Sequence, residues 1–167
     1  MVHSIELVFD PDTEAGIRQV WDELRAARLP SQVAAGRPHV TLTVAERIDA
    51  EVDEPLRICA ARLPLGCRIG APLLFGSSAL TLARLIVPSV GLLALHEAVD
   101  AACASHVTGG PFAHLRPGEW TPHVTLRRRL APADVGAALG VIGAADIDGT
   151  FIGLRRWDGD ERIEYPI

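Results

Sequence analysis

The chain has 167 residues, of which 49% are apolar, and its formal net charge is −5. This length suits one domain with a well-filled core. The acidic balance argues against a protein that coats long nucleic acid, because that mode of binding needs a broad basic face. The most apolar stretch, residues 71–95, is interrupted by glycine, proline and arginine, so no membrane-spanning helix is expected. An early carboxylate at Glu6 breaks any signal-peptide pattern, which favours a cytoplasmic protein.

The cysteines predict neither a disulfide framework nor a zinc site. Three is an odd number, and no two of them form a Cys-x-x-Cys pair. Reduced, buried thiols are therefore expected at Cys59, Cys67 and Cys103. The histidines outside the repeated motif described below also lack the spacing of a zinc site, so no metal is expected.

The N-terminal part of the chain is predicted to run strand, helix, strand, helix. Residues 2–9 are rich in β-formers, and Asp-Pro at their end offers a helix start. Along residues 10–28, apolar side chains recur every three or four positions, which is the period of one buried helical face. A proline then introduces a strand at residues 39–45, and a shorter helix is expected at residues 53–63.

The remaining chain is predicted to contain two hairpins, two helices, a loop and a further strand. In chain order these are strands 65–75 and 79–87, helix 88–106, loop 107–118, strand 122–130, helix 132–139, and strands 145–157 and 161–167. Because hairpins connect neighbouring strands, this order favours an antiparallel α+β fold over a doubly wound parallel sheet. We expect a single domain that spans residues 1–167.

One pentapeptide, Pro-His-Val-Thr-Leu, occurs twice, at residues 38–42 and 122–126, with one copy in each half of the chain. Alternate residues of a strand face the same way. We therefore expect His39, Thr41 and Thr43 to share one face of the first strand. The alternate residues Val40, Leu42 and Val44 are expected to enter the core.

In the second copy, His123, Thr125 and Arg127 are expected to share the corresponding face. Each histidine supplies a proton donor or acceptor beside a hydroxyl that can bond an anionic oxygen. Two such pairs suit phosphodiester transfer, in which one group takes a proton from the attacking oxygen and another gives one to the leaving oxygen. Two structural strand histidines are the alternative, but repetition of the whole pentapeptide favours a shared function.

The repeat resembles the two-histidine phosphoesterase superfamily. Arg128, the fifth residue after His123, matches an arginine common in its bacterial and archaeal 2′-5′ RNA ligase and cyclic phosphodiesterase branch. The resemblance implies two lobes of antiparallel sheet with flanking helices, a central cleft and a pseudo-two-fold internal repeat. It also implies hydrolysis of a 2′,3′-cyclic phosphate to a 2′-phosphate, or reversible joining of 2′-5′ linkages. The expected substrate is a small cyclic nucleotide or an RNA end, with no metal, no cofactor and no stable protein partner.

The resemblance also implies roles for the motif residues. His123 would activate the attacking water or hydroxyl, and His39 would protonate the leaving 3′ oxygen. Thr41 and Thr125 would hold the non-bridging oxygens of the phosphate through fixed hydrogen bonds. A non-catalytic module that binds a nucleotide or an RNA end is the alternative, because a protein could keep the cleft and lose turnover.

The arginine that would grip the substrate is open between two neighbours. Strand alternation turns Arg127 toward the cleft, whereas the resemblance selects Arg128, and a bulge at the strand end could reconcile either with the site. We favour Arg128. Three aromatic residues could stack on a base, although core or rim positions are more usual for such side chains: Phe9, Trp120 and Trp157. His96, on the apolar side of a predicted helix, is expected to be a satisfied core residue.

Overall fold

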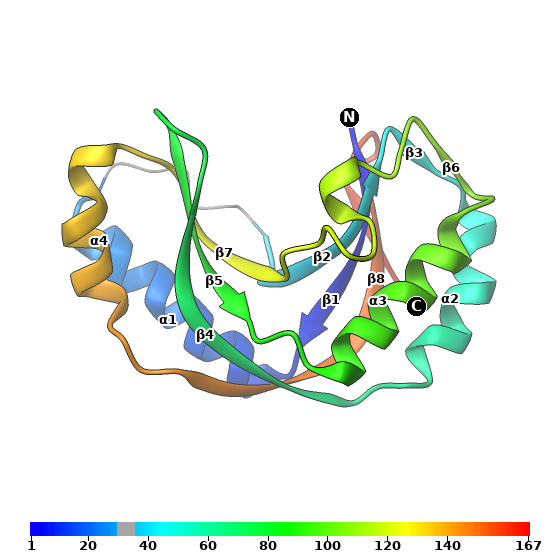
Figure 1. Cartoon of the computed structure of the whole chain (residues 1–167), viewed down its shortest axis with the longest axis horizontal. Helices are drawn as coiled ribbons and strands as arrows, with labels where there is room; N and C mark the ends of the chain where they lie inside the picture. The colour runs from blue at the N-terminus through cyan, green and yellow to red at the C-terminus, as the bar shows by residue number, and fades with distance from the viewer. Residues whose placement is uncertain (30–35) are drawn as a thin grey trace.

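The computed structural model describes residues 1–29 and 36–167, and it shows strands that run between two groups of helices (Figure 1). The strands of the main sheet, all antiparallel to their neighbours, are β1 (His3–Phe9), β2 (His39–Ala45), β4 (Leu65–Phe75), β5 (Leu80–Ile86), β7 (His123–Leu130), β8 (Ile147–Asp158) and β9 (Ile163–Pro166). A small second sheet pairs β3 (Arg47–Ile48) with β6 (Val107–Thr108). The α-helices are α1 (Pro11–Ala26), α2 (Asp53–Ala60), α3 (Val90–Cys103) and α4 (Val135–Ile142).

The order of the main sheet is β1-β2-β7-β5-β4-β8-β9, and the long strand β8 also pairs with β1. The first half of β8 pairs with β4, where Ile69 faces Ile147, and the second half pairs with β1, where Ser4 faces Trp157. β8 therefore joins two groups of strands on one side, while β2 and β7 join them on the other. The meeting of β2 and β7 brings the two copies of the pentapeptide together.

The helices lie in two pairs at opposite ends of the molecule: α1 packs against α4, and α2 packs against α3 (Figure 1). Pro11 and two acidic residues open α1, as suits the positive end of a helix dipole. Its buried face carries Ile17, Trp21 and Leu24, in the predicted period. The strand β1 is buried along its whole length because it lies between β2 and β8.

The antiparallel α+β prediction is confirmed, with some elements shorter than expected. α2 ends at Ala60 and α3 at Cys103, and the segment predicted as a loop carries β6 and the short 3₁₀ turn η2 (Ala113–Leu115). All three cysteines are free thiols, but Cys67 is only half-buried. In the part of the chain that the structure describes, no helix has the length and apolarity needed to cross a membrane. A pseudo-two-fold relation of the whole chain stays a prediction, as does the single domain.

Candidate active site

β2 and β7 meet through the antiparallel pair of Val40 with Val124, whose side chains are buried. In this antiparallel register, His39 lies opposite Thr125, and Thr41 lies opposite His123. Because side chains alternate along a strand, the four polar side chains lie on the opposite face from the valines. They are all half-buried: His39, Thr41, His123 and Thr125.

Both histidine rings are oriented by the same kind of backbone contact. Nδ1 of His39 lies 2.8 Å from the carbonyl oxygen of Arg37, and Nδ1 of His123 lies 2.7 Å from that of Thr121. A carbonyl oxygen only accepts hydrogen bonds, so each Nδ1 carries a proton and donates it. This leaves Nε2 of each ring as the nitrogen that can take up or give a proton.

The surroundings of His123 favour its neutral form. Burial lowers the pKa of His123 below its usual value of 6.5, and the charges of Arg128, His39 and His114 lower it further. The hydrogen bond to the Thr121 carbonyl acts in the opposite direction. The ring of Phe75 covers the imidazole, with 4.6 Å between ring centroids. A neutral imidazole with a lone pair on Nε2 can act as a base near neutral pH.

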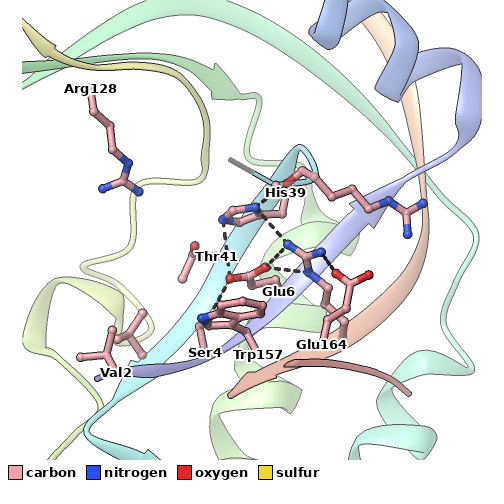
Figure 2. Close-up of a pocket in the computed structure, with 12 residues that line it drawn as sticks. Val2, Ser4, Glu6, His39, Thr41, Arg128, Trp157 and Glu164 are labelled. Carbon is pink, nitrogen blue, oxygen red and sulfur yellow. Dashed lines mark hydrogen bonds and ion pairs between the residues drawn. The ribbon is translucent and has the colours of Figure 1, made fainter. Parts of the chain in front are cut away.

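The surroundings of His39 are different, because a carboxylate lies beside its reactive nitrogen. Oε1 of Glu6 is 3.6 Å from Nε2 of His39. The hydroxyl of Ser4 donates to the same oxygen over 2.6 Å, and Arg155 binds the other carboxylate oxygen through Nε at 2.8 Å and Nη2 at 2.7 Å. Figure 2 shows this buried network beneath the imidazole.

A pocket of about 360 Å³ opens beside His39 and Thr41. Its walls include the Trp157 indole, and Arg128 lies across the open space with its guanidinium turned toward the pocket (Figure 2). The pocket therefore combines a proton-exchanging nitrogen, a hydroxyl, a cation and an aromatic wall. These groups suit an anionic ligand that also carries a flat ring.

The strand β2 departs from regular alternation one residue after its threonine. Glu6 pairs with Thr41 while Ile5 pairs with Thr43, so Leu42 is an extra residue, a β-bulge. Thr43, which alternation predicts on the face of His39, is 1% exposed. Val44, which alternation predicts in the core, lines the pocket instead. The prediction for these two residues was wrong because the bulge reverses the faces beyond it.

The strand β7 has a bulge at the matching position, and this bulge places the two arginines on different faces. Ala83 pairs with Thr125 and Leu82 with Arg127, so Leu126 is the extra residue. Arg127 is 1% exposed and donates from Nη1 to the carbonyl oxygen of Leu24. The structure therefore does not bring Arg127 to the pocket, contrary to simple alternation. Arg128 lines the pocket, as the resemblance implied.

Indole and imidazole donors bind the backbone beside both bulges. Trp120 donates from Nε1 to the carbonyl oxygen of Thr41 over 3.0 Å, and Trp21 donates to that of Thr125 over 3.2 Å. His96 is buried, its Nε2 lies 3.1 Å from the carbonyl oxygen of Leu42, and its ring stacks on Trp120. A bulge interrupts the strand ladder, so its carbonyls need such partners. His96 is thus a satisfied core residue, as predicted, and Trp120 has a packing role.

Several residues of the site could not be named from the repeat. Glu6 stands in β1, which is buried along its whole length, and Arg155 lies in the buried stretch 154–156 of β8. A charged residue at such a position is a sign of a polar partner. The ring of Phe75 packs on His123 from the end of β4, and His114 in η2 acts on His123 through its charge, with no motif around either residue. Only the folded chain brings these residues to the histidines.

The chain is similar to known proteins in sequence and in fold. Residues 11–161 match the family model of the 2′-5′ RNA ligase superfamily. No curated protein sequence matches the chain. The structure is similar to apo LigT of E. coli, with TM-score 0.57, 19% identity, and coverage of 99% of this chain and 94% of LigT. It is also similar to TT0787 of Thermus thermophilus, with TM-score 0.62, 18% identity, and coverage of 100% of this chain and 95% of TT0787.

Usb1 of Kluyveromyces marxianus is a third similar structure, with TM-score 0.52, 14% identity, and coverage of 99% of this chain and 98% of Usb1. At these identities the likeness to solved structures shows a common fold. The family model, by contrast, spans most of the sequence. The chain therefore belongs to the 2′-5′ RNA ligase superfamily of two-histidine phosphoesterases.

Proposed function

We propose that the protein is a metal-independent phosphodiesterase that opens a 2′,3′-cyclic phosphate to a 2′-phosphate, with His123 as general base and His39 as general acid. The observation that carries this proposal is the matched orientation of the two rings. Each Nδ1 is held by a backbone carbonyl, so each Nε2 is available, yet their charged neighbours differ. A base and an acid with the same geometry and different surroundings are what an in-line displacement needs.

In the proposed reaction, Nε2 of neutral His123 takes a proton from water as its oxygen attacks phosphorus. The bond between phosphorus and the 3′ oxygen breaks, and Nε2 of protonated His39 gives that oxygen its proton. The hydroxyls of Thr41 and Thr125 and the guanidinium of Arg128 hold the non-bridging oxygens. With the 5′ hydroxyl of a second ribose in place of water, the same groups would join a 2′-5′ linkage, with the 3′ oxygen again leaving as a hydroxyl, and the reverse of that reaction would cleave the linkage.

The pocket beside His39 indicates which part of the substrate it would hold. The leaving oxygen must lie on the side of the acid, and that oxygen belongs to the ribose. The nucleoside would therefore occupy the pocket, with Trp157 as a stacking surface for the base. LigT of E. coli has been solved in complex with 3′-AMP and with ATP, which supports a nucleotide ligand here.

Turnover of nucleoside 2′,3′-cyclic monophosphates tests the proposal. We expect conversion of at least one of the four common cyclic nucleotides to a nucleoside 2′-phosphate. Chromatography separates this product from the 3′ isomer. Dinucleotides with a 2′-5′ linkage and with a 3′-5′ linkage form a second, matched pair of substrates. Recovery of every compound unchanged, with binding detected by calorimetry, would identify a binding module instead of an enzyme.

A further inference from the structure

We infer that Glu6, held by Arg155 and Ser4, is the positioning residue that keeps the exchangeable proton on His39 and so assigns the acid role to that histidine. This inference rests on the proposed function. It concerns a residue outside both copies of the pentapeptide, on a strand that carries neither histidine. If it holds, the division of labour between two similar histidines is set by β1 and β8 and not by the motifs.

The first step is that the Glu6 carboxylate is buried and fixed. Glu6 is 5% exposed and Arg155 is 7% exposed. Arg155 holds one carboxylate oxygen through two nitrogens, and Ser4 donates to the other oxygen. Donors therefore satisfy both carboxylate oxygens, and hydrogen bonds of this kind favour the charged form of a carboxyl group. The rotamer of Glu6 is also fixed, with Oε1 toward the imidazole.

The second step concerns the sum of charges around His39. Arg155 approaches Nδ1 of His39 at 3.3 Å and opposes the effect of Glu6, but its charge is shared between the carboxylates of Glu6 and Glu164. Arg37, two residues before His39, is paired with Glu14 at 2.5 Å. His123 and Arg128, both on β7, face the same space, and positive charge on either of them opposes positive charge on the His39 ring. The group next to Nε2 itself is the anionic one, at 3.6 Å.

The third step is the contrast with the other histidine. The charged groups that lower the pKa of His123 are Arg128, His39 and His114, all cationic when protonated. At His39, a carboxylate occupies the position from which it can attract a proton on Nε2. An anion within this distance of a titrating group commonly changes its proton affinity by about ten-fold or more. The two rings can therefore hold different protonation states in one cleft.

The test uses Glu6→Gln, which removes the charge but keeps the shape of the side chain. Rate against pH is measured on one cyclic nucleotide, and the ring protons of His39 and His123 are followed by NMR titration without substrate. We expect the alkaline limb of the rate profile and the NMR midpoint of His39 to move to lower pH by about one unit. The midpoint of His123 should stay within about 0.3 units, and KM within about two-fold.

Glu164→Gln is the matched control. Glu164 also binds Arg155, but its side chain is 48% exposed, whereas that of Glu6 is buried. In Glu164→Gln, the alkaline limb of the rate profile should move by less than about 0.3 pH units, because exposed charges are screened by solvent and salt. Should Glu6→Gln fold poorly in a thermal melt, Ser4→Ala provides the second variant. It loosens the carboxylate without removing charge, and it should move the His39 midpoint in the same direction by a smaller amount.

Two outcomes would overturn the inference. An unchanged His39 midpoint in a folded Glu6→Gln protein would make Glu6 a structural residue. A raised KM with both limbs in place would make it a substrate contact. The NMR titration needs no turnover, so it tests Glu6 even if no cyclic nucleotide is cleaved. Absence of cleavage by the wild type would instead refute the proposed function.

Discussion

Val44 and Arg128 occupy the same step of the repeated strand, since each is the fifth residue after its histidine and each lines the pocket beyond a bulge. The bulges at Leu42 and Leu126 turn both side chains to the polar face. The two copies thus share a backbone device and differ in the side chain that it presents. One copy offers an apolar surface, and the other offers the guanidinium that faces the pocket.

Replacing Arg128 by alanine should raise KM for a cyclic nucleotide by about ten-fold or more, because a charge-assisted hydrogen bond to phosphate is worth roughly 1.5–3 kcal/mol. The melting temperature should change little, since this side chain is exposed. Steady-state kinetics and a thermal melt measure both quantities.

Arg127→Ala is the matched comparison, and it should do the reverse. Its guanidinium is buried and bonded to backbone, so its loss should lower the free energy of unfolding by about 1–3 kcal/mol. KM of the folded fraction should stay near that of the wild type. A stable Arg127→Ala protein with a raised KM would return the substrate contact to Arg127.

The sequence alone predicted the strands that carry the repeat, the antiparallel class and the helix positions, because these depend on local periodicity and on turn residues. It could not predict on which side Thr43 and Arg127 lie. Alternation counts residues along one strand, whereas a bulge depends on the neighbouring strand, and both bulges fall at the leucine of a Thr-Leu pair that looks regular. For the same reason the carboxylate of Glu6 could not be placed beside His39 before β1 and β2 were seen to pair.

Replacing Trp21 or Trp120 by phenylalanine should destabilise the protein and slow the reaction. Each indole donates to the carbonyl of a motif threonine, and phenylalanine keeps the ring but leaves that carbonyl without its donor. The expected loss is about 1–3 kcal/mol in the free energy of unfolding by urea, together with a lower kcat, because the strand that orients each histidine is loosened. Trp157→Phe, in the pocket wall, should cost less than about 1 kcal/mol. Equal losses in all three variants would argue against a specific role for the two bulge contacts.

Activity should survive a chelator, because proton transfer by two histidines and hydrogen bonds to the phosphate need no Lewis acid. Among the described residues, the side chains that could hold a cation together are His3, Asp158 and Asp160, and they line a pocket other than the one beside His39. Turnover after dialysis against EDTA should equal that of the untreated protein. Loss of turnover that a divalent ion restores would contradict the mechanism.

The most direct test of the two-histidine mechanism is the dependence of rate on pH for the wild type, His39→Ala, His123→Ala and the double mutant, on one cyclic nucleotide. The base must be neutral, and the pKa of His123 is lowered, so the acid limb should fall below pH 6.5. Each single mutant should lose about 10²–10⁴-fold in rate, and each should lack one limb of the bell. The double mutant should be little worse than the poorer single mutant, because both groups act on one transition state. A single mutant that keeps the full bell and near wild-type turnover would show that its histidine is structural and would contradict the mechanism.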